Sequence, residues 1–176
     1  MLILSGNYTD AVRTFDRAIA IEPVFFEAWN GKADALNRAH QYNDALNASD
    51  HALALNQDYV AGWLNRGYIL YNLGKYEDEM KAYETAIGID PESPEAWFNR
   101  GYALAAMGRY DEAIRSFDRV AELNPMYPNL QANRDIAVKN RNASTPFVLR
   151  YGPWLALICF IILGYGWWMG RKRKKK

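Results

Sequence analysis

Apolar residues recur at helical spacing in two stretches that closely follow each other, 97–107 and 111–123. Spacings of three and four residues place such side chains on one face of an α-helix. Gly108 lies between the stretches, where a glycine takes the positive φ that ends a helix. Pro125 follows the second stretch and stops it. The pattern therefore predicts a helix, a tight turn and a second helix.

The same pattern returns at intervals of 34 residues along the chain. The matching positions are Trp63 and Trp97, Gly67 and Gly101, Gly74 and Gly108, Tyr76 and Tyr110, and Pro91 and Pro125. An earlier copy has Trp29, Ala33, Tyr42, Ala45 and Ala52. A unit of this length buries its apolar face only by stacking on its neighbours. An ordinary helical bundle gives no reason for one fixed period.

This period and these positions resemble the tetratricopeptide repeat family. The resemblance implies an all-α fold, a right-handed superhelical solenoid of helix-turn-helix repeats. Small residues such as Gly101 and Ala113 would let two helices approach closely. We predict a truncated first repeat at 1–25, full repeats at 26–59, 60–93 and 94–127, and a capping helix at 128–142.

Three positions depart from the regular pattern. Met1 corresponds to the middle of a first helix, so we expect further repeats or a signal peptide before it, unless 1–4 packs locally. His40 replaces the turn glycine and needs a positive φ, which is less favourable for histidine; we interpret it and His51 as structural or solvent-facing. Glu79 replaces a small residue, which predicts a looser seam or a side chain that reaches to solvent.

A different kind of sequence follows the repeats. Residues 143–150 form a short linker, which Pro146 keeps from being helical. Residues 151–170 carry no charge. At about 1.5 Å per residue they span about 30 Å, which predicts a transmembrane helix in contact with the lipid bilayer. The basic tail, 171–176, ends the chain.

The charge distribution separates the repeats from the end of the chain. All 20 acidic residues precede Phe147, as do 14 of the 21 basic ones, so this part carries a formal charge of −6 and the last 30 residues carry +7. A basic tail beside the predicted span favours a single-pass membrane protein with a cytoplasmic tail and extracytoplasmic repeats, and argues against nucleic-acid binding. Insertion after synthesis would instead leave the repeats inside.

No motif for catalysis is present in the sequence. It has no glycine-rich phosphate loop, nucleophile elbow or metal-ligand motif, so we predict no enzymatic activity, no metal and no cofactor. The single cysteine, Cys159, excludes an intrachain disulfide. Glycosylation sequons occur at Asn7, Asn47 and Asn142, and the last is the acceptor we favour because it lies near the linker.

The resemblance implies that the first helix of each repeat lines a concave, peptide-binding groove. Asn65, Asn99 and Asn133 recur at one position of these helices, and each amide offers a donor and an acceptor to a peptide backbone. Alternatively, these asparagines bond only the neighbouring repeat. The candidate groove residues are Asn65, Tyr68, Tyr71, Phe98, Asn99, Tyr102 and Asn133.

The charge of this groove narrows the functional prediction. Glu27, Asp34 and Glu95 fall on it with few lysines, so an acidic ligand is disfavoured, and the family's basic clamp for a terminal carboxylate is not matched. We predict a membrane-anchored, non-catalytic scaffold that binds a peptide or a partner protein. The alternatives are an accessory subunit of a membrane complex and a non-catalytic fragment of a larger enzyme. The pattern indicates no oligomeric state.

Overall fold

The computed structural model describes residues 8–144, which form eight α-helices and no strand. The helices are α1 (Tyr8–Ile21), α2 (Phe26–Arg38), α3 (Tyr42–Leu55), α4 (Val60–Asn72), α5 (Tyr76–Ile89), α6 (Pro94–Ala106), α7 (Tyr110–Leu123) and α8 (Leu130–Ser144). Contacts divide the chain into two units, Met1–Ala137 and Val138–Lys176, which are described separately. Among the described residues, the second unit holds only the end of α8.

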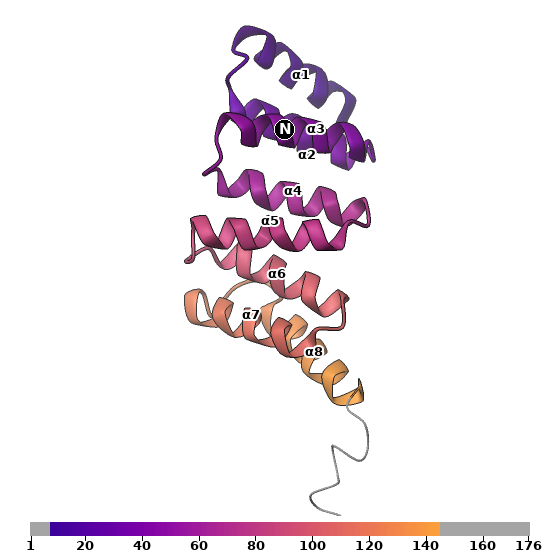
Figure 1. The fold of residues 1–176 in the computed structure, drawn as a ribbon, viewed down its shortest axis with the longest axis vertical. Coiled ribbons are helices and arrows are strands. Elements are labelled where there is room, and N and C mark those ends of the chain that lie inside the picture. Colours follow the sequence, from indigo (N-terminus) through magenta and orange to yellow (C-terminus); the bar gives the residue numbers. More distant parts are fainter. Residues whose placement is uncertain (1–7, 145–176) are drawn as a thin grey trace, which may run out of the picture. The chain divides into compact units, whose positions relative to one another are not determined.

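Successive helices of the first unit pack against each other in chain order. The helices α2 and α3, α4 and α5, and α6 and α7 form antiparallel pairs, and α3 contacts α4 as α5 contacts α6 (Figure 1). We call α2, α4 and α6 the A helices and α3, α5 and α7 the B helices. The helix α1 packs on α2. This arrangement confirms the predicted all-α solenoid of helix pairs.

The turn inside each pair contains one residue with a positive φ. Gly74 has a φ of 71° and Gly108 one of 76°. At the equivalent position His40 has a φ of 60°, as its place in the repeat predicted. Its Nδ1 lies 2.6 Å from the hydroxyl oxygen of Tyr42. The geometry of the turn is therefore kept where the glycine is absent.

The turn between pairs is held by two hydrogen bonds that repeat along the chain. The indole Nε1 atoms of Trp29, Trp63 and Trp97 donate to the carbonyl oxygens of Pro23, Gln57 and Pro91 at 3.0, 2.8 and 2.9 Å. The Oδ1 atoms of Asn56, Asp90 and Asn124 accept from the backbone N–H groups of Asp58, Glu92 and Met126 at 3.1, 3.0 and 3.1 Å. Together these bonds fix where each A helix begins after the preceding B helix.

Close helix approach depends on small residues in the seams. A Cβ on Gly101 would lie 2.7 Å from Cε1 of Phe117, and one on Gly67 would lie 2.4 Å from Cε1 of Tyr83. Real Cβ atoms do not approach other carbon atoms so closely. Each glycine therefore makes room for an aromatic ring on the B helix of its own pair.

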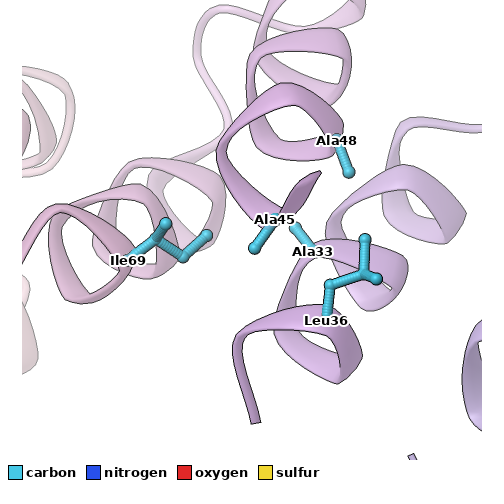
Figure 2. Packing of buried hydrophobic residues seen from close by; sticks show 5 residues of the cluster. All are labelled: Ala33, Leu36, Ala45, Ala48 and Ile69. Atoms are coloured by element: carbon cyan, nitrogen blue, oxygen red, sulfur yellow. The ribbon is translucent and has the colours of Figure 1, made fainter. Parts of the chain in front are cut away.

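The core between α2, α3 and α4 is built largely from alanine (Figure 2). Ala33 and Ala45 are fully buried, and Ala48 is nearly so. Leu36 and Ile69 fill the remaining space. Because these alanines are short, the helix backbones pack closely and a few larger side chains complete the core.

Glu79 does not reach to solvent. Its side chain lies in α5 and is only 2% exposed. Burial raises the pKa of its carboxyl to about 7, because the charged form loses its hydration there. The interpretation of Glu79 as a side chain that extends to solvent was therefore wrong.

The described structure contains no membrane-spanning helix. Among residues 8–144 no helix is both long and apolar enough to cross a bilayer. The longest, α8, has 15 residues, whereas a span needs about 20. The predicted span at 151–170 and the tail at 171–176 lie outside the described residues. This finding contradicts the predicted single-pass membrane localisation, with extracytoplasmic repeats and bilayer contact. We do not retain that prediction.

Candidate functional site

A pocket of about 460 Å³ opens on the A helices; we call it the groove pocket. Its lining residues are Asn30, Gly31, Asp34, Ala61, Leu64, Asn65, Tyr68, Tyr83, Glu95 and Asn99. All of them except Tyr83 belong to α2, α4 or α6. Three consecutive repeats therefore contribute to one site, on the helices for which a groove was expected.

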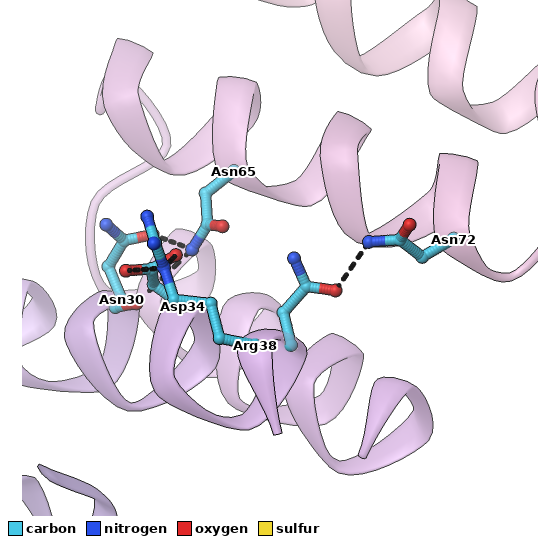
Figure 3. A network of polar contacts seen from close by, with 6 residues as sticks. Asn30, Asp34, Arg38, Asn65 and Asn72 are labelled. Carbon is cyan, nitrogen blue, oxygen red and sulfur yellow. Dashed lines mark hydrogen bonds and ion pairs between the residues drawn. The ribbon is translucent and has the colours of Figure 1, made fainter. Parts of the chain in front are cut away.

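Asparagine pairs connect α2 with α4. The Nδ2 atom of Asn65 donates to Oδ1 of Asn30 at 3.0 Å and to its carbonyl oxygen at 3.3 Å (Figure 3). The Nδ2 atom of Asn72 donates to Oδ1 of Asn37 at 2.9 Å. Asn65 therefore bonds the neighbouring repeat through its Nδ2 atom and also lines the groove pocket.

The other two periodic asparagines have different surroundings. Asn99 lines the groove pocket, and within residues 8–144 its side-chain amide makes no hydrogen bond. The Nδ2 atom of Asn133 donates to the carbonyl oxygen of Asn129 at 2.9 Å, one turn earlier. Of these three equivalent asparagines, Asn99 is thus the one whose side-chain amide makes no hydrogen bond in the described residues.

Tyrosine side chains extend from α4 and α6. Tyr68 is 52% exposed and Tyr102 is 50% exposed. The ring of Tyr71 stacks on that of Tyr68, with centroids 6.4 Å apart and planes 10° apart. The pKa of the Tyr71 hydroxyl is raised, first by Tyr102 and then by burial. These tyrosines offer large apolar faces to solvent beside the groove pocket.

Phe98 is partly buried and packs against α7 and the turn that follows it. Its ring centroid lies 5.6 Å from that of Phe117 and 4.9 Å from that of Tyr127. It does not line the groove pocket. The structure thus brings Asn65, Tyr68 and Asn99 together in that pocket and gives Phe98 contacts with α7 and the following turn.

The groove pocket is lined by acidic but not basic side chains. Arg38 contacts both carboxylate oxygens of Asp34, because its Nε atom lies 2.9 and 3.1 Å from them (Figure 3). This bond raises the pKa of the Arg38 guanidinium. Glu95 makes no ion pair within residues 8–144. Its carboxylate is therefore the uncompensated charge of the pocket.

A ladder of ion pairs away from the groove pocket was not predicted. A basic residue of α2, α4, α6 or α8 reaches an acidic residue 16 positions earlier, on α1, α3, α5 or α7 respectively. The pairs are Lys32–Asp16 at 2.7 Å, Arg66–Asp50 at 2.9 Å, Arg100–Glu84 at 3.6 Å and Arg134–Asp118 at 2.6 Å. The sequence contained the signal, because both members recur every 34 residues. These pairs join each repeat to the one before it.

The histidines take structural places. His51 stacks on Trp29 with ring centroids 4.6 Å apart, and His40 occupies its turn. Within the described part of the chain, no three His, Cys, Asp or Glu side chains gather closely enough to hold a metal ion. The histidines therefore contribute no candidate metal site in residues 8–144.

Stacked helix pairs that follow one another along the chain define a helical-repeat protein. Family models described as TPR repeat match residues 67–108, and models described as tetratricopeptide repeat match 94–127 and 5–48. The chain therefore belongs to the tetratricopeptide repeat family.

Solved structures show the same fold at low sequence identity. TTC0263, a thermophilic TPR protein of Thermus thermophilus, aligns with a TM-score of 0.72 and 19% identity over 78% of this chain and 76% of its own. YrrB, a TPR protein with an unusual peptide-binding site, gives 0.63 and 20% over 81% and 74%. The first TPR of Spaghetti (RPAP3), bound to the HSP90 peptide SRMEEVD, gives 0.62 and 18% over 65% and 90%. No curated protein sequence matches the chain.

Proposed function

We propose that this protein is a non-catalytic scaffold that binds an extended peptide segment of a partner protein along its A helices. The observation that carries the proposal is the groove pocket, to which three consecutive repeats contribute. A ligand lying across α2, α4 and α6 would contact each repeat in turn. Such a surface suits an elongated ligand better than a compact small molecule.

Relatives of known structure support this proposal. Proteins of the tetratricopeptide repeat family typically act as non-catalytic scaffolds. YrrB has a peptide-binding site, and the repeat domain of Spaghetti (RPAP3) is bound to a peptide. We take from them only the class of ligand, an extended peptide. Sequence identities of 20% and 18% support a shared fold but do not indicate which peptide sequence this protein binds.

The chemistry of the surface suits a peptide backbone. The unbonded amide of Asn99 can donate to a peptide carbonyl and accept from a peptide N–H. The exposed rings of Tyr68 and Tyr102 recur at one period and would cover apolar side chains of the ligand. In this proposal Asn65 has a double role, because its Nδ2 joins two repeats and its carbonyl oxygen is left for the ligand.

The remaining predicted residues act indirectly or at the margin. Tyr71 stacks on Tyr68 and holds that ring in place. Phe98 supports α6 from behind through its contact with Phe117. Asn133 would meet a ligand only if it extended beyond the groove pocket toward α8. Direct binding is therefore concentrated on Asn65, Tyr68, Asn99 and Tyr102.

Selection of peptides on the full-length chain tests the proposal. Random peptides displayed on phage are selected, synthesised with a fluorophore, and titrated by anisotropy. Asn99→Ala and Tyr102→Ala should each weaken binding by roughly tenfold, as expected for a central contact. Both side chains lie on the surface of α6, so circular dichroism should show unchanged helicity.

Met126→Ala is the matched control. Met126 is 88% exposed and lies in the turn before α8, so it tests the loss of an exposed apolar side chain outside the groove pocket. Equal affinities for Tyr102→Ala, Asn99→Ala and Met126→Ala would contradict the proposal. A failure to select any peptide that binds would also contradict it.

A further inference from the structure

Tyr83 lines the groove pocket although it belongs to a B helix. It lies in the middle of α5, and its side chain is 4% exposed. A Cβ on Gly67 would lie 2.4 Å from Cε1 and 2.7 Å from Cζ, the ring carbon that carries the hydroxyl. The ring therefore passes beside α4 through the space left by this glycine, and any larger residue at 67 would block its path.

The equivalent positions in the other repeats have no phenolic hydroxyl. They are Phe15, Ser49 and Phe117. Ser49 and Phe117 are completely buried, whereas Tyr83 meets the groove pocket. Tyr83 thus differs from its aromatic counterparts by one oxygen atom, on a residue that lines the pocket.

The hydroxyl of Tyr83 is an unused hydrogen-bonding group. Within residues 8–144 it makes no hydrogen bond. Its pKa is raised, chiefly by burial and then by Glu79, Tyr68 and Glu95. Tyr68 and Glu95 also line the groove pocket, which is consistent with a hydroxyl directed toward it. This hydroxyl is therefore available to bond a ligand in the groove pocket.

The groups around this hydroxyl favour a cation that donates hydrogen bonds. Glu95 brings a carboxylate without an ion pair in the described residues, and Asn65 brings a carbonyl oxygen whose amide nitrogen is already bonded. The half-exposed ring of Tyr68 offers a face suited to a cation. No lysine or arginine lines the pocket to compete.

We propose that Tyr83, Glu95, Asn65 and Tyr68 form a subsite for one lysine or arginine side chain of the bound peptide. Glu95 pairs with the charge, the oxygens of Tyr83 and Asn65 accept N–H bonds, and the ring of Tyr68 covers the aliphatic stem or the cation. The subsite rests on the proposed peptide-binding function and adds the chemistry that selects the ligand. An acidic side chain is excluded from this subsite because Glu95 would repel it.

Peptides selected on the full-length chain also test this subsite. The selected peptides should share a lysine or arginine, and replacing that residue by glutamine should weaken binding about tenfold. Tyr83→Phe should weaken binding of the parent peptide by about five- to tenfold and leave the glutamine peptide unaffected. Glu95→Gln should show the same dependence on the basic residue.

Tyr110→Phe is the matched control, because it removes a hydroxyl from α7 outside the groove pocket. Tyr83→Phe should fold normally, since Phe117 fills the same place in the next repeat. Circular dichroism and the unfolding midpoint check this expectation. The selected peptide with its basic residue replaced by glutamine is the negative probe.

Different results separate this inference from the proposed function. Peptides that lose affinity with Tyr102→Ala but bind Tyr83→Phe as tightly as the wild type would overturn the subsite and leave the groove function intact. Selected peptides that contain neither lysine nor arginine would also overturn the subsite. Peptides that bind Tyr102→Ala and Tyr83→Phe as tightly as the wild type would overturn the subsite together with the proposed function.

Discussion

Replacing Gly101 by alanine should destabilise the α6/α7 pair, although alanine is the better helix former. The added Cβ would lie 2.7 Å from Cε1, 2.9 Å from Cδ1 and 3.1 Å from Cζ of Phe117. Phe117 is completely buried, and its ring contacts Phe98 with centroids 5.6 Å apart. The ring therefore has little freedom to withdraw, and α6 and α7 would have to separate.

Two opposing contributions set the magnitude. Glycine to alanine inside a helix stabilises by about 1 kcal/mol. Overpacking a closely packed interior costs about 1–3 kcal/mol. The net change should be a destabilisation of up to about 2 kcal/mol. Gly101→Leu adds more volume at the same point and should cost more than Gly101→Ala.

Urea unfolding followed by circular dichroism measures this change. The control is Gly88→Ala, because Gly88 lies within α5 and a Cβ there would meet nothing within 4 Å. We expect this variant to be as stable as the wild type or slightly more so. In a Phe117→Leu background the cost of Gly101→Ala should shrink. Gly101→Ala that stabilises as much as Gly88→Ala would refute the assigned contact.

Three further changes test other features. The carboxyl of Glu79 has a pKa of about 7 in the fold against 4.5 when unperturbed, so between these values the folded state holds a proton that the unfolded state has released. Stability should therefore fall as pH rises from about 4.5 to 7, by roughly 2–3 kcal/mol, and Glu79→Gln should abolish this slope in unfolding curves measured across pH. His40→Gly should stabilise by roughly 0.5–1 kcal/mol in thermal unfolding, because it relieves a φ of 60°; no gain would mean that the bond to Tyr42 outweighs the strain. Arg66→Ala should cost less than about 1 kcal/mol, since its pair with Asp50 is partly exposed, and a loss above about 2 kcal/mol would show that the ion-pair ladder acts cooperatively.

The period of the chain was sufficient to predict the helix pairs and their turns. Because the spacing is fixed, a backbone conformation needed in one turn is needed at the equivalent position of every other turn. The positive φ of His40 therefore followed from the glycines at 74 and 108. The place of Gly101 against the facing helix followed in the same way. Both properties belong to the backbone of the repeat and need no knowledge of the neighbouring side chains.

The contacts of individual side chains did not follow from the period. Asn65 bonds Asn30, which is 35 residues away rather than 34, so comparing equivalent positions could not pair them. Glu79 is buried because the helices around it close over its carboxyl, whereas sequence allowed it to extend outward. Tyr83 belongs to a B helix and was not expected in a groove of A helices. Each case depends on packing between repeats.

The three seams within the helix pairs explain why one repeat alone offers a hydroxyl to the groove pocket. Their equivalent residue pairs are Ala33 with Ser49, Gly67 with Tyr83, and Gly101 with Phe117. Where the A helix has alanine, the B helix has a small residue, and where it has glycine, the B helix has an aromatic ring. The side chain of Ser49 is too short to leave the interior, where its oxygen is buried without a hydrogen bond in the described residues. Phe117 spans the seam but carries no polar side-chain atom. Only the combination of Gly67 and Tyr83 both spans a seam and carries an oxygen, so the specificity that we propose arises where one repeat departs from the others.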